Sequence, residues 1–129
     1  MDTLKPNLTG KLVLIVEDNE TSRFYFEAAL KNLKAKTIWA KNGQEGLDFF
    51  KTNDDICLVL MDLNMPEMDG FEATRKMKAL RPEVPIIVQS AYILSGEEAR
   101  SFEAGCDEFL AKPIRLNLLI ESITRHLAG

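Results

Sequence analysis

Side chains that could carry phosphoryl or metal chemistry follow the apolar runs of this sequence. Glu17 and Asp18 come after the run 12–16, and Asp62, Ser90 and Lys112 come after later runs. Such runs are typical of strands buried on both faces of a parallel sheet. Because parallel strands end at one edge of the sheet, we expect the acids to meet there, beside the lysine and the hydroxyl. Crowded carboxylates repel one another, so this edge favours a hard cation such as Mg²⁺.

The elements that must position these side chains follow from periodicity. Strand patterns cover 11–16, 36–40, 57–61, 85–89 and 107–111, and helix patterns cover 20–33, 43–51, 70–80, 96–104 and 115–127. Asn42, Asp69 and Ser95 each stand before a helix with a Glu three residues on, which is a capping pattern. Asn19 can cap the first helix, and Gly105 is typical of a left-handed helix end. This alternation predicts right-handed crossovers with helices on both faces of one sheet.

The expected strand order rests on the acids rather than on the number of strands. The order 2-1-3-4-5 places the first and third strands side by side, so that Asp18 and Asp62 face each other. Lys34, Lys36 and Lys41 around the second strand suit a sheet edge. The predicted fold class is therefore α/β, a flavodoxin-like (βα)5 three-layer sandwich with a five-stranded parallel sheet.

Composition limits the classes of function. The net charge of −4 argues against nucleic-acid binding, which needs a basic surface. No apolar stretch reaches the roughly 20 residues of a membrane span. Cys57 and Cys106 lack metal-ligand spacing, so we expect two buried free thiols in a reduced, cytoplasmic protein. Residues 1–10 show no periodicity and are expected to be a leader or linker before one domain at 11–128.

Short motifs follow one another in a set order along nearly the whole chain. They are Glu17-Asp18, Asn42-Gly43, the run 58–66 around Asp62, Met68-Asp69-Gly70, Ser90-Ala91, Ala104-Gly105 and Lys112-Pro113. This ordered set resembles the chemotaxis-regulator-like receiver domain of two-component response regulators. Residues 63–74 and the segment ending at Gly10 resemble, more narrowly, the receiver of a hybrid histidine kinase. We favour that reading over a stand-alone regulator.

The resemblance implies a phosphoacceptor signalling domain of a phosphorelay. Asp62 would accept a phosphoryl group from a phosphohistidine on a histidine kinase or a histidine phosphotransfer domain. Mg²⁺ would be held by Asp18, Asp62 and the backbone carbonyl of Asn64, with Glu17 acting directly or through water. Such a domain is no enzyme beyond catalysing its own phosphorylation and dephosphorylation.

The same resemblance assigns roles at the ends of the last two strands. Lys112 would pair with the phosphoryl oxygens, and its bond to Pro113 resembles a cis peptide. Ser90 would bond one phosphoryl oxygen, and Phe109 would turn inward on activation. Gly70 would have a structural role at the start of its helix. Activation would act on the face formed by 96–104, 107–111 and 115–127, which could bind partners or a second copy of the chain.

Three further expectations concern single residues. Tyr92 and Asn64 flank the path of the attacking water in the family, so both would set the lifetime of the phosphorylated state. Gly46 stands where the family usually has Ala and would weaken its helix. His126 is expected to be a solvated helix-end residue rather than a phosphohistidine.

The residue types alone, without the family resemblance, leave other functions open. A Mg²⁺-dependent phosphatase with an aspartate nucleophile would need a second carboxylate two residues after Asp62, where Asn64 stands. A flavin-binding module would need a phosphate loop after the first strand, but the acids of residues 17–20 repel phosphate. A non-phosphorylated interaction module on the same fold is disfavoured by the intact acidic set.

Overall fold

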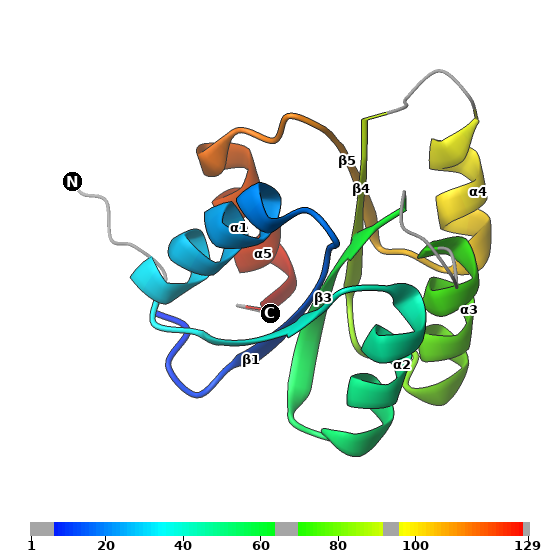
Figure 1. The fold of residues 1–129 in the computed structure, drawn as a ribbon, viewed down its shortest axis with the longest axis horizontal. Helices are drawn as coiled ribbons and strands as arrows, with labels where there is room; N and C mark the ends of the chain where they lie inside the picture. Colours follow the sequence, from blue (N-terminus) through cyan, green and yellow to red (C-terminus); the bar gives the residue numbers. More distant parts are fainter. Residues whose placement is uncertain (1–6, 64–69, 92–95, 128–129) are drawn as a thin grey trace.

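Residues 7–63, 70–91 and 96–127 are described by a computed structural model, in which strands and helices alternate along the chain (Figure 1). Each expected boundary differs from the observed one by at most one residue at either end, so the predicted elements are confirmed. The elements are β1 (Leu12–Val16), α1 (Glu20–Asn32), β2 (Lys36–Ala40), α2 (Gly43–Thr52), β3 (Ile56–Asp62), α3 (Gly70–Leu80), β4 (Ile86–Ser90), α4 (Glu97–Ala104), β5 (Glu108–Ala111) and α5 (Leu116–Leu127).

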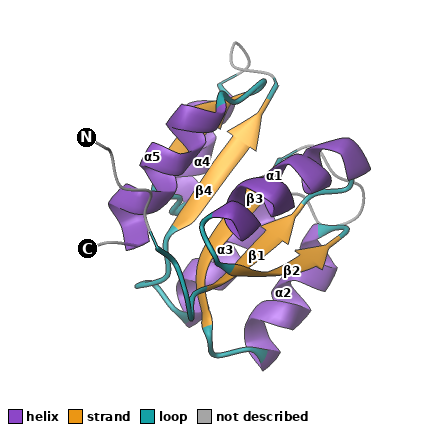
Figure 2. Cartoon of the chain, turned by 90° about the vertical axis from the view of Figure 1, so that its left-hand side faces the viewer, coloured by secondary structure: helices purple, strands orange, loops and turns teal. Residues whose placement is uncertain are grey.

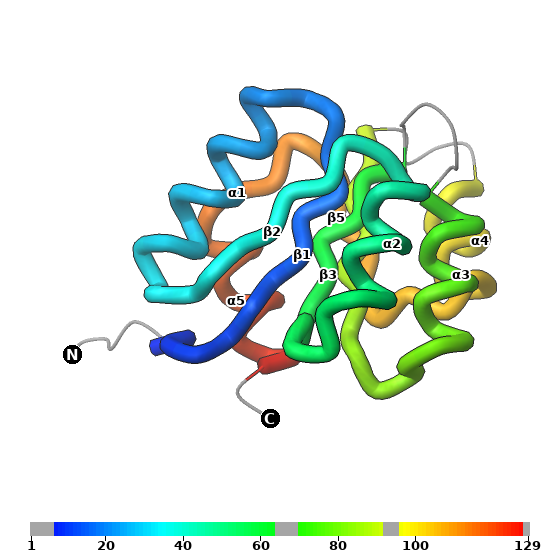
Figure 3. Tube along the Cα trace, turned by 60° about the horizontal axis from the view of Figure 1, so that its bottom comes forward, coloured from blue at the N-terminus to red at the C-terminus, as the bar shows by residue number. Residues whose placement is uncertain are grey.

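The strands form one parallel sheet in the order β2-β1-β3-β4-β5, which confirms the predicted order (Figures 2 and 3). Val16 at the end of β1 pairs with Met61 of β3 and with Ala40 of β2. At the other side of the sheet, Ser90 pairs with Ala111. The residues that follow these pairs therefore emerge side by side at one edge of the sheet.

Helices cover both faces of the sheet. Helices α1 and α5 lie on one face, and α2, α3 and α4 lie on the other (Figures 1 and 2). Along β1, Val13 and Ile15 pack in the core on the α1 and α5 side, while Leu14 and Val16 pack in the core on the opposite side. All four are fully buried, and burying one such side chain stabilises the fold by about 1.5–3 kcal/mol. Burial on both faces is the reason that the strand reads as an unbroken apolar run.

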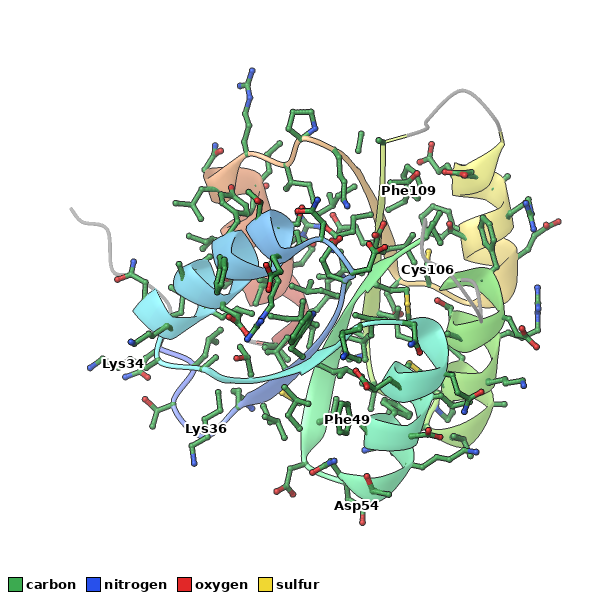
Figure 4. The ribbon with its side chains drawn as sticks, viewed as in Figure 1. Lys34, Lys36, Phe49, Asp54, Cys106 and Phe109 are labelled. Atoms are coloured by element: carbon green, nitrogen blue, oxygen red, sulfur yellow. The ribbon has the colours of Figure 1, made fainter. Side chains whose placement is uncertain are left out.

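Strand β2 lies at an edge of the sheet, as its lysines predict. Lys34 and Lys36 are exposed beside it (Figure 4). Charged side chains at this position discourage pairing with the edge of another chain.

The predicted ends of three helices are confirmed in atomic detail. Asn19 Oδ1 accepts a hydrogen bond from the backbone N–H of Ser22, and Asn42 Oδ1 accepts one from that of Glu45, at 2.9 and 2.7 Å. Gly105 ends α4 with a φ of 108°, the left-handed conformation that glycine adopts without strain.

The start of α4 differs from the expectation. Gly96 occupies the N-cap position with a φ of 78° and, being a glycine, offers no side chain to cap the helix. Ser95, which was expected to be the cap, lies outside the described residues, and so does Asp69 before α3.

Two segments are buried to a different extent than their sequence suggests. Leu8, within the expected leader, is buried at 4% exposure, and its backbone N–H donates to the carbonyl of Leu33 at 2.8 Å. Leu8 therefore packs on the domain, while Asn7, Thr9 and Gly10 beside it are exposed. Both cysteines are free, but only Cys106 is buried, while Cys57 is half-buried.

Two other residues have packing roles that the sequence did not indicate. A Cβ atom added at Gly46 would lie 2.8 Å from Cγ2 of Val16, so this glycine permits close approach of α2 to β1. His126 is half-buried with Nε2 2.9 Å from Oε1 of Glu108, so the expectation of a solvated side chain was wrong.

Within the described residues, no helix combines the length and apolar character that crossing a bilayer requires.

Candidate functional site

Three acids meet at the carboxyl ends of β1 and β3. Because Val16 pairs with Met61, the next residues, Glu17 and Asp62, emerge together. One carboxylate oxygen from each of Glu17, Asp18 and Asp62 lies within 4.8 Å of the other two. Glu17 and Asp62 are buried, with 0% and 2% exposure, whereas Asp18 is exposed. The convergence that the sequence predicts is present, with two acids held inside and one facing solvent.

Lys112 reaches the buried acids from the end of β5. Its Nζ lies 3.2 Å from Oε1 of Glu17 and 3.4 Å from Oδ1 of Asp62. The backbone N–H of Lys112 donates to the carbonyl of Ser90 at 2.8 Å, which ties this segment to the end of β4. The peptide bond between Lys112 and Pro113 is cis. One ammonium group therefore faces two buried carboxylates. The segment that carries it is hydrogen-bonded to the end of the neighbouring strand, β4.

The electrostatics of Glu17 show that this charge balance is incomplete. Burial away from water, and next the negative charge of Asp62, raise the pKa of Glu17 to about 7. Lys112 opposes this shift, as does the backbone N–H of Asn19, which donates to Oε2 of Glu17 at 3.2 Å. The site thus holds more negative charge than its lysine offsets.

The donor set fits a hard divalent cation. Carboxylate oxygens are the ligands that Mg²⁺ prefers, and an added positive charge would offset both the burial of the Glu17 charge and its repulsion by Asp62, which together raise the pKa of Glu17. The exposure of Asp18 leaves the cluster open to solvent on one side, which suits an ion that keeps some of its water ligands.

The backbone of Glu17 is held from the edge of the sheet. Its N–H donates to the carbonyl of Ala40 at 3.0 Å, and its carbonyl accepts a hydrogen bond from Nε1 of Trp39 at 2.6 Å. The Arg23 guanidinium carbon lies 3.7 Å from the centroid of the Trp39 ring, and Arg23 also pairs with Glu27 on α1 at 3.0 Å. Sequence reasoning missed Trp39. The one feature of the sequence that could have indicated its role is that the single tryptophan of the chain stands just before the end of the second strand.

Ser90 is fully buried at the end of β4, and its hydroxyl donates to Oε1 of Glu97. Glu97 is the first residue of α4 and is half-buried. Sequence reasoning also missed this pair, because two residues seven apart on different elements leave no periodic signal.

Phe109 lies on β5, and Gly70 is the first residue of α3. Phe109 is half-buried, pairs in the sheet with Val88, and packs against the core that includes Cys106 (Figure 4). A Cβ atom added at Gly70 would lie 2.7 Å from the backbone oxygen of Asp62, so glycine allows α3 to begin against the end of β3. Asn64 and Tyr92 lie outside the described residues.

A doubly wound parallel sheet with acids and a lysine at the carboxyl ends of its strands defines an α/β domain with an acidic cluster at the edge where such folds bind ligands. The sequence matches the family described as "Response regulator receiver domain" over residues 13–124, and the chain therefore belongs to this family. It is a receiver domain of two-component signalling.

Relatives and solved structures agree with this assignment. The polar-differentiation response regulator DivK of Brucella anthropi is 36% identical over 120 residues, covering 91% of this chain and 96% of DivK. The receiver domain of sensor histidine kinase PA1611 from Pseudomonas aeruginosa PAO1 is 29% identical with a TM-score of 0.86, covering 94% of this chain and all of that one. That structure has a magnesium ion coordinated in its active site cleft. A CheY-like receiver domain protein from Methanospirillum hungatei JF-1 gives the same identity and TM-score, covering 92% of this chain and 94% of that one.

Proposed function

We propose that Asp62 is the phosphoacceptor of this receiver domain and takes the phosphoryl group from a phosphohistidine on a histidine kinase or histidine phosphotransfer domain. The observation that carries the proposal is the setting of Asp62. Its carboxylate is buried at the end of β3, lies 3.4 Å from the Lys112 ammonium, and shares its site with two more acids.

The chemistry asks little of the protein beyond positioning and charge. An oxygen of Asp62 forms a bond to phosphorus while the bond between phosphorus and the donor's imidazole nitrogen breaks. The electron pair of the broken bond stays on that nitrogen, and Asp62 becomes an acyl phosphate. Such transfers depend on in-line placement and on neutralising charge spread over the phosphoryl oxygens. Lys112 supplies one positive charge at that place.

Glu17, Asp18 and Asp62 would hold the Mg²⁺, together with the backbone carbonyl of Asn64 that the family resemblance adds. When bound, the ion offsets negative charge on the carboxylates and on the phosphoryl oxygens. The close approach of the three carboxylates supports this assignment, as does the raised pKa of Glu17, which comes first from burial and next from the charge of Asp62.

Ser90 and Phe109 would carry the response from the site to the surface. A phosphoryl oxygen on Asp62 would draw the Ser90 hydroxyl, and Phe109 would turn inward, which biases an existing two-state equilibrium. The surface affected would be the one formed by α4, β5 and α5. Phe102, Leu116 and Leu118 on these helices are 46–48% exposed, which supports binding of a partner or a second copy of the chain.

A recess beside Lys112 supports docking of the phosphoryl donor. It has a volume of about 400 Å³ and is lined by Thr21, Ser22, Tyr25, Phe26, Ala91, Lys112, Pro113 and Ile114. An apolar residue next to the donor's phosphohistidine would fit there. A bulky Thr21→Trp substitution should slow transfer from a protein donor and spare labelling by acetyl phosphate. Lys31→Trp, at the far end of α1, is the control.

The remaining assignments follow from the same reading. We infer a receiver domain over 11–128 that catalyses only its own phosphorylation and dephosphorylation, and a cytoplasmic location supported by its two free cysteines. A receiver excised from a hybrid histidine kinase is our preferred context.

The test is labelling of the purified chain with acetyl phosphate and Mg²⁺, measured by intact-protein mass spectrometry. We expect one phosphoryl group on the parent and on Asp48→Asn, an exposed control on α2, and none on Asp62→Asn. Unchanged labelling of Asp62→Asn would overturn the assignment.

A further inference from the structure

A side-chain hydrogen bond joins the end of β4 to the start of α4. The Ser90 hydroxyl donates to Oε1 of Glu97, and Ser90 is fully buried. A hydrogen bond to a carboxylate is stronger than one between neutral groups. Because a carboxylate oxygen can only accept, the hydroxyl proton of Ser90 points to Glu97 in this contact.

Helix α4 is lightly buried, and its first turn also contacts α3, where the Arg100 guanidinium carbon lies 4.0 Å from the centroid of the Phe71 ring. Two of its eight residues, Ser101 and Ala104, are buried, and its N-cap residue, Gly96, makes no side-chain cap hydrogen bond. The Ser101 hydroxyl donates to the backbone oxygen of Glu97 at 2.7 Å, but this contact lies within the helix. The bond between Ser90 and Glu97, by contrast, ties this turn directly to the end of a strand.

The same hydroxyl is the group that the proposed function assigns to the phosphoryl oxygens. Ser90 follows Gln89, which pairs in the sheet with Asp62, so the hydroxyl lies on the strand next to the phosphoacceptor. A serine hydroxyl has one hydrogen to donate. Donation to Glu97 and donation to a phosphoryl oxygen therefore exclude each other.

We propose that Glu97 is a positioning residue that holds the Ser90 hydroxyl in the unphosphorylated protein and so lowers the affinity of the site for a phosphoryl group. Arrival of the phosphoryl group would transfer the hydrogen bond from Glu97 to Asp62's phosphoryl oxygen and release the first turn of α4. This inference rests on the proposed function, because it assumes that Asp62 carries the phosphoryl group.

The experiment measures the affinity for beryllofluoride, a phosphoryl mimic, in saturating Mg²⁺ by calorimetry. Glu97→Gln weakens the acceptor and keeps the shape of the side chain. Glu98→Gln removes the same charge from the next, exposed residue of the same turn and is the matched control. We expect roughly 3- to 10-fold tighter binding for Glu97→Gln, the size of one weakened hydrogen bond, and parent-like binding for Glu98→Gln.

Two further measurements separate the hydrogen bond from a simple loss of negative charge. In a Ser90→Ala background, Glu97→Gln should have no effect, and without beryllofluoride it should leave the Mg²⁺ affinity unchanged. Equal gains in Glu97→Gln and Glu98→Gln, a gain that persists without the Ser90 hydroxyl, or no gain at all would each overturn the inference. Failure of every protein, the parent included, to bind beryllofluoride would instead contradict the proposed function, and this inference with it.

Discussion

The two sides of the site are held in different ways. On the acid side, Glu17 follows β1 and Asp62 ends β3, and the residues before each of them, Val13–Val16 and Leu58–Met61, are buried. The backbone of Glu17 is fixed by Ala40 and Trp39. On the switch side, formed by β4, α4 and β5, the buried Ser90 depends on an acceptor from a lightly packed helix. Groups that bind a charged ligand gain from being fixed in advance, whereas groups that respond to it need a second arrangement of similar energy.

The helices show the same difference. Helix α3 buries five of its eleven residues, while α4 buries two of eight. Asn side chains cap α1 and α2, and such a cap stabilises a helix by about 1 kcal/mol. The N-cap residue of α4 is Gly96, which makes no side-chain cap hydrogen bond. A lightly buried helix is easier to shift than a deeply packed one, as we expect for the part of the molecule that responds to phosphorylation.

The largest expected effect comes from removing the ammonium group of Lys112, which pairs with both buried acids. Lys112→Met should slow labelling by acetyl phosphate by about 100-fold or more, because a fixed charge at the reacting oxygens is lost. Lys51→Met, an exposed lysine on α2, is the control. Time-resolved mass spectrometry gives the rates, and a rate within a few-fold of the parent would show that Lys112 is not needed for transfer.

The next effect tests the crowding on the acid side. The pKa of Glu17 is raised from 4.5 to about 7, so between these values the folded protein binds more protons than the unfolded chain. Without Mg²⁺, the free energy of unfolding should therefore fall as pH rises from about 4.5 to 7, and stay reduced above it.

Glu17→Gln should remove that fall and be more stable than the parent at pH 8, by an amount on the order of 3 kcal/mol, since one pKa unit corresponds to about 1.4 kcal/mol. Urea titrations in EDTA across this pH range measure it, with the exposed Glu20→Gln as control. Parallel pH profiles of the free energy of unfolding for the parent and Glu17→Gln would contradict a raised pKa of Glu17 in the folded protein.

A smaller effect tests how the acid side is fixed. Trp39→Phe keeps an aromatic ring beneath Arg23 but removes the N–H that donates to the carbonyl of Glu17. We expect Mg²⁺ binding to weaken several-fold, by about 1 kcal/mol, the net contribution of one hydrogen bond. In the parent, Mg²⁺ should also change the fluorescence of Trp39. Unaltered Mg²⁺ affinity in Trp39→Phe would show that the indole does not position Glu17.

The smallest effect concerns the lifetime of the signal on the switch side. Tyr92 lies two residues after Ser90 in the sequence, and its bulk should crowd the path of the attacking water. Tyr92→Ala should lose its phosphoryl group several-fold faster at saturating Mg²⁺, a change on the order of 1 kcal/mol in the barrier. An equal or slower loss would exclude this role.

The fold was predictable because its signals are local and repeated. Apolar runs buried on both faces mark the strands, and Asn19, Asn42 and Gly105 mark helix ends within one turn of chain. The strand-order rule for parallel sheets then brought Asp18 and Asp62 together without any knowledge of side-chain contacts.

What the sequence determined by itself is which residues lie in strands and helices, and which acids, lysine and hydroxyl gather at one edge of the sheet. Tertiary structure alone decided that Trp39 bonds the carbonyl of Glu17, that Glu97 takes the hydroxyl of Ser90, and that Leu8 belongs to the core. The reason is physical. Periodicity records which face of an element is buried, whereas a hydrogen bond between distant side chains depends on how far each helix packs from the sheet.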